Sequence, residues 1–337
     1  MSEQKEKFIK IQFMTEKKEG HGEDAPPLLI AKDGAVAVGV FDGMGGAGAA
    51  ICDSEYGNNY TKAYVASRIV EKEIESFLED YLGKEHISIE LLKERLVKRL
   101  MQEQETFPPK TKSMLRSKLV RDYPTTMAMI TLHTTETGWK IDSFWAGDSH
   151  CYLWTKKGFF QISKDDLEED NDPMENLRND AAISNCICAD RDFLINHKPL
   201  IIPNDPIAIL CATDGCFGYF PTPMHFEAML KKSLQKAENE EDWKNIVEQA
   251  IQKVTGDDTS LALVGIGFKS FGQFKTAMTN QSVSDVKKFG EIETKIERQK
   301  NELAKLQEEY EKAIKNGWEN YKKKYMKYIN EENDVNA

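Results

Sequence analysis

The sequence of 337 residues lacks long apolar runs, zinc-type cysteine pairs and an excess of positive charge. No apolar run approaches the roughly 18 residues of a transmembrane helix, and the start MSEQKEKFIK lacks the apolar core of a secretory signal. We therefore expect a cytoplasmic protein. None of the six cysteines forms a C-x-x-C pair, so we expect reduced, buried thiols rather than zinc ligands. The net charge of −11 argues against a nucleic-acid partner, because phosphates are held by Lys and Arg.

The most distinctive stretch is glycine-rich and contains a single acid. VFDGMGGAGAA, from Val40 to Ala50, follows the apolar run GAVAVGVF and places Asp42 at the expected end of a strand. Glycines allow other groups to approach the backbone closely, and a carboxylate beside such a turn suits a hard divalent cation. The sequence therefore predicts a metal site at a strand end.

Two alternatives to a metal site remain open at this stretch. Gly43-x-Gly45-x-x-Gly48 matches the dinucleotide fingerprint. Asp42, however, would place negative charge beside the pyrophosphate, and the sequence has no Gly-Lys-Ser/Thr for a phosphate loop. A purely structural glycine turn is the other alternative.

Acids next to glycine recur at four expected strand ends. They are Asp42-Gly43, Gly147-Asp148, Asp214-Gly215 and Gly256-Asp257. If these ends meet, the carboxylates repel one another unless they share protons or bind cations. Their oxygen ligands favour Mg²⁺ or Mn²⁺ over zinc. Two such ions about 4 Å apart can activate a water and stabilise charge on a phosphoryl group.

The hydrophobic pattern predicts strands and helices in alternation, with a long irregular segment at 164–203. We expect strands at 7–15, 27–34, 34–42, 206–215 and 260–268, an antiparallel meander over 125–163, and helices at 51–82, 89–104, 224–237 and 241–253. Asp33-Gly34 is a hairpin signal between the second and third strands. Its position would bring Glu23 and Asp24 near Asp42.

In order and spacing, several motifs resemble the metal-dependent serine/threonine protein phosphatases of the type 2C family. They are Glu23-Asp24, VFDGMGG, Thr125-Thr126, AGDS, CATDG and GDDTSLALV, within roughly Lys7 to Phe268. The resemblance implies an α+β fold, a four-layer α-β-β-α sandwich of two antiparallel sheets flanked by helices. It also implies hydrolysis of phosphoserine and phosphothreonine by a water activated at two Mn²⁺ or Mg²⁺ ions.

The resemblance also implies a role for individual residues. Asp42 would bridge both metals, Gly43 would bind through its carbonyl, and Asp24 would hold a metal-bound water. Glu23 would serve one metal, Asp214 and Asp257 the other, and Asp148 a third, weaker one. The catalytic set would thus be Asp42, Asp214 and Asp24.

Departures from the family pattern define the alternatives. Glu19 stands where many members have a phosphate-binding Arg, so we consider His21 and Lys18, with Lys17, as replacements. Met44 occupies a position that is His in many eukaryotic members. The alternative is a catalytically weak or inactive relative that acts as a regulatory scaffold; a hydrolase of a small phosphorylated metabolite is a third hypothesis.

The expected domain organisation is a phosphatase domain at 1–268 with a flap at 164–203, a linker at 269–283 and a charged helix at 284–337. The helix has near-heptad apolar spacing, which fits a coiled coil or packing on its own domain. Besides a phosphoprotein substrate, we expect a protein partner or self-association through 284–330. The 12 acids and 12 bases after Val283 favour no membrane contact.

Overall fold

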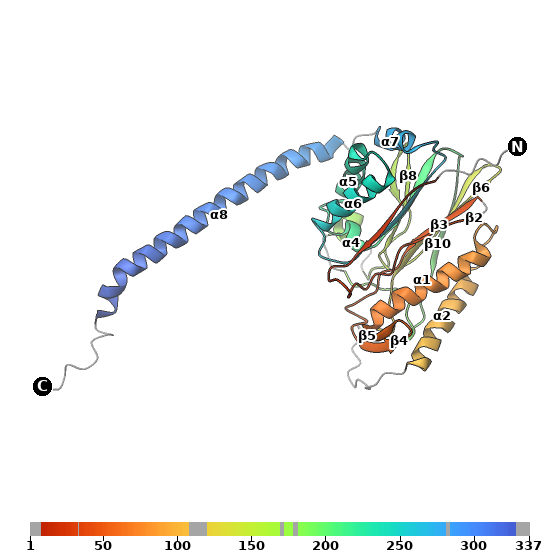
Figure 1. The fold of residues 1–337 in the computed structure, drawn as a ribbon, viewed down its shortest axis with the longest axis horizontal. Coiled ribbons are helices and arrows are strands. Elements are labelled where there is room, and N and C mark those ends of the chain that lie inside the picture. Colours follow the sequence, from red (N-terminus) through yellow and green to blue (C-terminus); the bar gives the residue numbers. More distant parts are fainter. Residues whose placement is uncertain are drawn as a thin grey trace. The chain divides into compact units, whose positions relative to one another are not determined.

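Two antiparallel sheets form the centre of the unit that spans residues 1–282, and helices cover their outer faces (Figure 1). This computed structural model describes residues 8–32, 34–107, 120–168, 172–177, 181–280 and 284–327. The expected four-layer arrangement is confirmed.

The first sheet has the strand order β1-β12-β11-β8-β9. Its strands are β1 (Ile9–Thr15), β8 (His150–Thr155), β9 (Gly158–Gln161), β11 (Ile207–Ala212) and β12 (Thr259–Ile266). The first and last strands of the sandwich are neighbours, with Ile9 opposite Gly265 and Thr15 opposite Thr259. This sheet therefore joins two segments that are far apart in the sequence.

The second sheet has the order β10-β7-β6-β3-β2. Its strands are β2 (Leu28–Lys32), β3 (Ala35–Val40), β6 (Met127–Thr135), β7 (Gly138–Ala146) and β10 (Asn196–Ile202). β2 and β3 pair antiparallel as expected, although Asp33 of the predicted turn lies outside the described residues.

The strands in the middle of each sheet are buried on both faces, which explains their continuous apolar sequences. In β3, Val36, Val38 and Val40 pack between the sheets against residues such as Ile209 of β11. Ala37, on the opposite face of β3, belongs to the core beneath the helices. Alternate residues of one strand thus enter two separate cores.

Two groups of helices form the outer layers. α1 (Lys62–Tyr81) and α2 (Ile89–Thr106) share a core with the second sheet. α5 (Pro223–Lys236), α6 (Glu240–Gln252) and α7 (Phe271–Thr279) share one with the first. The short helices α3 (Pro173–Asn176) and α4 (Asp214–Phe217) lie in the connections.

The prediction of one helix over 51–82 is wrong in its first part. A hairpin of β4 (Ile51–Ser54) and β5 (Gly57–Thr61) precedes α1, which begins at Lys62. Gly57 has a φ of +129° and Asn59 one of +66°, and neither conformation fits a helix. The Thr61 side chain accepts a hydrogen bond from the Tyr64 backbone and caps the helix.

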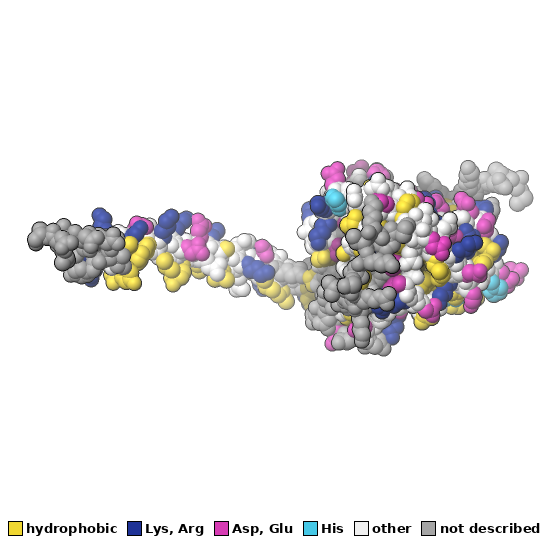
Figure 2. Space-filling model, turned by 90° about the horizontal axis from the view of Figure 1, so that it is seen from below, with side chains coloured by type: hydrophobic (Ala, Val, Ile, Leu, Met, Phe, Trp, Pro, Cys, Tyr) yellow, Lys and Arg dark blue, Asp and Glu magenta, His cyan; other side chains and the backbone are white. Residues whose placement is uncertain are grey.

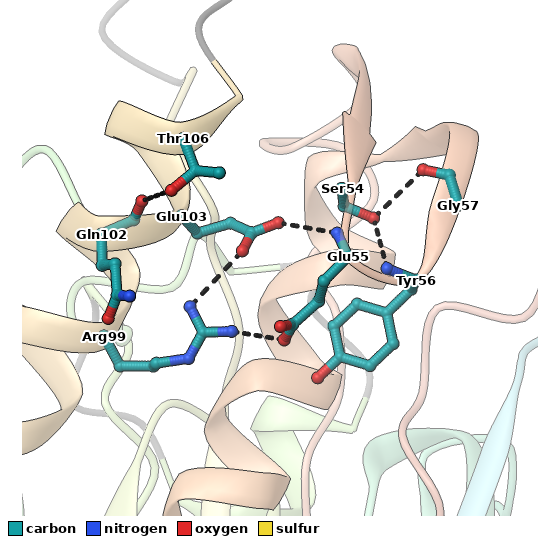
Figure 3. A network of polar contacts seen from close by, with 8 residues as sticks. All are labelled: Ser54, Glu55, Tyr56, Gly57, Arg99, Gln102, Glu103 and Thr106. Atoms are coloured by element: carbon teal, nitrogen blue, oxygen red, sulfur yellow. Dashed lines mark hydrogen bonds and ion pairs between the residues drawn. The ribbon is translucent and has the colours of Figure 1, made fainter.

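A polar network holds this hairpin to α2 (Figure 3). Arg99 forms ion pairs with Glu55 of the hairpin and with Glu103 of its own helix. Glu103 also accepts a 3.4 Å hydrogen bond from the Glu55 backbone. Within the hairpin, the Ser54 hydroxyl donates to the Gly57 carbonyl and accepts from the Tyr56 backbone.

Two further expectations need correction. The strands at 125–163 are not one meander, because β6 and β7 pair in the second sheet and β8 and β9 in the first. The chain changes sheets around Gly147, whose φ is +101°. The segment 164–203 is also not irregular throughout, since β10 pairs with β7 at the edge of the second sheet. An edge position explains how β10 tolerates Pro199.

The expected linker at 269–283 contains α7. Phe274 and Met278 of this helix are buried in the core beneath the first sheet, where Phe274 contacts Trp243. The chain divides into two compact units, 1–282 and 283–337. The second unit contains α8 (Ser284–Tyr325). No helix in the described ranges is long and apolar enough to cross a membrane.

Candidate metal centre

The predicted acids lie where strands end or begin. Asp42 follows β3, Asp214 follows β11 at the start of α4, and Asp148 lies between β7 and β8. Asp257 precedes β12, and Glu23-Asp24 precede β2. Thr213, next to Asp214, donates to Asp24, and the Glu23 backbone donates to Asp258, next to Asp257. Asp148 and Asp214 line one cavity, so the two sheets bring these acids to one end of the sandwich.

Three aspartates form the interior of the cluster. Asp24 is 2% exposed, and the Asp42, Asp24 and Asp214 carboxyl groups lie close enough for their charges to act on one another. Burial, reinforced by the charge of Asp214, raises the pKa of Asp24 to about 8. Burial, followed by the charges of Asp24 and Asp214, raises the pKa of Asp42 well above its ordinary value. Close carboxylates without a cation share protons in this way.

Asp148 is a neighbouring acid with an unsatisfied atom. Its pKa is raised well above the ordinary value, first by burial and then by the charge of Asp214. Among the described residues, its buried Oδ1 finds no hydrogen-bond partner. A buried carboxylate oxygen without a donor is costly, so this atom is a natural ligand for a cation.

Glu23 and Asp257 lie at the outer side of the cluster. Glu23 accepts a 2.6 Å hydrogen bond from the Thr61 hydroxyl at the end of the β4–β5 hairpin. Burial, then the charges of Asp258 and Asp257, raise the pKa of Glu23. Asp257 is solvent-exposed as a residue, yet partial desolvation of its carboxylate and the charge of Asp214 raise its pKa.

Asp258, next to Asp257, has a different structural role. Its two carboxylate oxygens each accept a 2.7 Å hydrogen bond, one from the Lys17 backbone and one from the Glu23 backbone. These bonds fix the approach of the segment that carries Glu23. Asp257 Oδ1 accepts a 2.9 Å hydrogen bond from the Asp258 backbone, and Asp257 stays the predicted ligand of the pair.

Threonines behind the acids hold them in position. The Asp42 carbonyl accepts hydrogen bonds from the Thr125 hydroxyl at 2.7 Å and the Thr126 backbone at 2.8 Å. The Thr213 hydroxyl donates to Asp24 at 3.0 Å and accepts from the Ser260 backbone at 2.9 Å. The Thr125-Thr126 pair was visible in the sequence, whereas no sequence signal singled out Thr213.

Two glycines next to Asp42 permit close approach. A Cβ on Gly43 would lie 2.6 Å from the carbonyl oxygens of Glu23 and Ala63, and one on Gly45 would lie 1.8 Å from Glu23 Oε2. The contacts of Gly43 are with backbone atoms, so only glycine at this position lets the Glu23 segment lie against the turn.

A cavity of about 260 Å³ lies beside Asp148 and Asp214. The other lining residues are Asp165, Leu167, Asn176, Leu177 and Ala181 of the flap, and Phe217, Gly218 and Tyr219 near α4. Asp165, another lining residue, is bound by His150 at 2.7 Å and by Asn176 at 3.1 Å. This pairing with His150 lowers the pKa of Asp165 despite its burial. The hydrogen bond from Asn176 connects α3 of the flap to this acid.

The proposed phosphate ligands are less well placed. His21 and Lys18 are exposed and lie on the loop before Glu23, where the His21 backbone donates to the Lys18 carbonyl. The neighbouring Lys17 is the lysine whose charge acts on Asp257 and lowers its pKa. Arg68, which the sequence analysis missed, is buried nearby and donates to the Gly22 carbonyl at 3.3 Å.

The residues fit a hard divalent cation by their chemistry. The cluster supplies only oxygen ligands, it contains an orphaned carboxylate oxygen, and most of its acids have raised pKa values. In the described ranges, no three His, Cys, Asp or Glu side chains are already arranged as a metal-ligand group. Instead, burial and the charges of their neighbours raise the pKa values of the central carboxyl groups, so that they hold protons.

Comparison with known proteins agrees with this fold. The family model for protein phosphatase 2C matches residues 15–254. Among curated proteins, no sequence matches the chain.

Solved structures of phosphatases have a similar fold. A bacterial serine phosphatase has a TM-score of 0.55 at 16% identity, covering 79% of this chain and 100% of that one. Stp1, a serine/threonine phosphatase from Staphylococcus aureus, scores 0.56 at 16% identity, covering 78% and 96%. The Mycobacterium tuberculosis serine/threonine phosphatase PstP/Ppp scores 0.51 at 13% identity, covering 78% and 99%.

Proposed function

This chain belongs to the protein phosphatase 2C family, and from that premise we propose that it hydrolyses phosphoserine and phosphothreonine monoesters in proteins. The observation that carries the proposal is the gathering of acids from separate strand ends: Thr213, next to Asp214, donates to Asp24, and Asp148, whose buried Oδ1 has no partner among the described residues, lines one cavity with Asp214. Without a cation these buried acids must bind protons to lie so close together, whereas a divalent cation would compensate their negative charges.

The same residues are proposed to hold two Mn²⁺ or Mg²⁺ ions. The ligands would be Glu23, Asp42, the Gly43 carbonyl, Asp214 and Asp257, with Asp148 available to a third ion. The chemistry that bound cations supply is activation of a water and neutralisation of charge on the phosphoryl oxygens. The chain's own contribution is to gather the carboxylates, to fix Asp42 through Thr125 and Thr126, and to keep Asp24 out of solvent.

Turnover of p-nitrophenyl phosphate and of a phosphothreonine peptide, with Mn²⁺ and with chelator, tests the proposal. We expect activity only with the cation. Asp42→Asn and Asp214→Asn should each lower kcat/KM by at least about 100-fold, because each removes a charged ligand. Asp80→Asn, a matched change at an exposed position of α1, should leave it unchanged. Full activity of both site variants would refute the assigned roles.

One observation favours a second candidate, a regulatory relative with little activity. Glu19, an exposed acid, stands where the family resemblance calls for a phosphate-binding Arg. Calorimetry distinguishes the two candidates: tight Mn²⁺ binding that is lost in Asp42→Asn, without phosphate release from any phosphopeptide, would identify the scaffold.

We also propose self-association through the first part of α8. Ile292, Ile296, Leu303 and Leu306 are 46–61% exposed and follow the a and d positions of a heptad repeat. Sedimentation velocity of the whole chain should show a dimer that an Ile296→Lys/Leu303→Lys variant converts to a monomer. Asn301→Lys, a charge added outside these positions, should leave the dimer intact. A monomeric parent protein would exclude the proposal.

A further inference from the structure

The second half of α8 differs in composition from the first. We define the distal segment as residues 310–327. Its exposed apolar side chains are mainly aromatic, whereas the large exposed ones at 292–306 are aliphatic. The exposed apolar side chains of the distal segment are Tyr310 (68% exposed), Ile314 (54%), Trp318 (42%), Tyr321 (51%) and Tyr325 (60%).

These side chains share one face of the helix. They are spaced four, four, three and four residues apart, which places them on one side of an α-helix. Trp318 and Tyr321 both contact Tyr325, and their ring centroids lie 5.7 and 5.9 Å, respectively, from the Tyr325 centroid. Figure 2 shows apolar side chains gathered along one edge of α8 and charged ones along the other. The aromatic face is therefore continuous.

The charges of the distal segment are strongly unbalanced. It contains six lysines and only two glutamates, Glu311 and Glu319. The preceding residues 284–309 contain six bases and seven acids. The neutral total after Val283 thus conceals a basic segment. Lys322, Lys323 and Lys324 stand between Tyr321 and Tyr325 and end the helix with concentrated positive charge.

The distal segment does not continue the heptad repeat of the first half. The repeat of Phe289, Ile296 and Leu303 would next place Tyr310, Gly317 and Lys324 at position a. Gly and Lys are poor core residues for a coiled coil. Tyr and Trp, by contrast, are enriched at membrane–water interfaces, where the ring is buried and the polar group stays hydrated.

We propose that the distal segment of α8 binds the surface of an anionic phospholipid bilayer. The helix lies in the interface with its aromatic face toward the acyl chains, and its lysines reach the lipid headgroups. This inference is independent of catalysis. It replaces the expectation of no membrane contact, which depended on the balanced charge of the whole tail.

Co-sedimentation of the whole chain with lipid vesicles tests the proposal. The protein should bind vesicles of phosphatidylcholine with phosphatidylserine and not vesicles of phosphatidylcholine alone. Raising the salt concentration should weaken binding, because it screens the lysines. The triple change Lys322→Gln/Lys323→Gln/Lys324→Gln should weaken it about 100-fold, since each lysine near an anionic surface adds attraction.

A matched triple change separates this surface from a general effect of charge. Lys295→Gln/Lys300→Gln/Lys305→Gln removes the same charge from the first half of α8 and should leave binding unchanged. Trp318→Ala/Tyr321→Ala should weaken binding with all lysines present. Equal loss in the two lysine triples, or no binding of the parent to phosphatidylserine vesicles at low salt, would overturn the proposal. The proposal would also be overturned if Trp318→Ala/Tyr321→Ala bound the vesicles as the parent does and changed only the self-association measured by sedimentation velocity.

Discussion

Asp24 is an aspartate almost removed from solvent and surrounded by other acids. Its folded-state pKa of about 8 lies far above its ordinary value of 3.8. The pKa values of Glu23, Asp42, Asp148 and Asp257 are raised in the same direction. Without a cation, the folded protein therefore holds protons that the unfolded chain releases. Protonation removes the electrostatic repulsion between these carboxylates when no cation is bound.

This predicts how stability depends on pH. Because the folded state binds more protons than the unfolded state, stability should fall as pH rises from about 4 to about 8. Thermal unfolding in chelator should show a lower Tm at pH 8 than at pH 5.5, and Mn²⁺ should reduce the difference. Asp24→Asn should flatten the dependence, whereas Asp80→Asn should not. A Tm that rises over this range in chelator would contradict the shifts.

The positions of the candidate site residues in the fold were predictable from the sequence, because an acid beside a glycine at a strand end is a local pattern. Asp42, Asp148 and Asp214 lie where that pattern places them. The contacts between segments far apart in the chain could not be predicted from the sequence. The hydrogen bonds from Thr213 to Asp24 and from Lys17 to Asp258 join residues more than 180 positions apart. No local pattern marks such pairs.

At the scale of elements, the β4–β5 hairpin depends on contacts with α2. Tyr60 and Tyr64 are four residues apart, which made the whole stretch seem helical. In the structure Tyr60 precedes the helix and stacks on Tyr64, with ring centroids 4.1 Å apart. The hairpin is held by Arg99 and the buried Glu103, which lie 44 and 48 residues after Glu55 in the chain. Long-range contacts of this kind override local helical periodicity.

Removing Glu103 should therefore loosen the hairpin. Glu103→Ala leaves the Glu55 backbone donor and Arg99 without this acceptor, so the free energy of unfolding should fall by about 1–3 kcal/mol. Glu103→Gln keeps an acceptor and should cost less. Urea unfolding measures both variants. Glu94→Ala, on the exposed side of α2, is the control and should change the free energy of unfolding by no more than about 0.5 kcal/mol. Similar losses in the Ala and control variants would exclude a role for this network.

For the whole molecule, the boundary between the two units lies after α7. Phe274 of this helix packs against Phe268 and Trp243, so it completes the core beneath the first sheet. The sequence placed the boundary too early, because the polar and glycine-containing segment around Phe271 resembles a linker. Only the docking of Phe274 distinguishes it from one.

Two truncations test this boundary. Residues 1–282 should unfold at a Tm close to that of the whole chain, because the three hydrophobic cores, as far as the chain is described, are built from residues of the first unit. Residues 1–268 should lose at least about 3 kcal/mol, as expected when a buried Phe is removed. Differential scanning calorimetry compares them. Equal stability of the two truncated chains would mean that the first unit ends at residue 268, as the sequence predicted.

The pairing of β1 with β12 has a consequence for biosynthesis. Since Ile9 lies opposite Gly265, the nascent chain on a ribosome cannot close the first sheet until nearly the whole sandwich has been translated. Glu23 and Asp42 leave the ribosome well before Asp257 has been synthesised. A partly made chain therefore has no complete acid cluster, and any catalysis begins only once synthesis has passed the last strand.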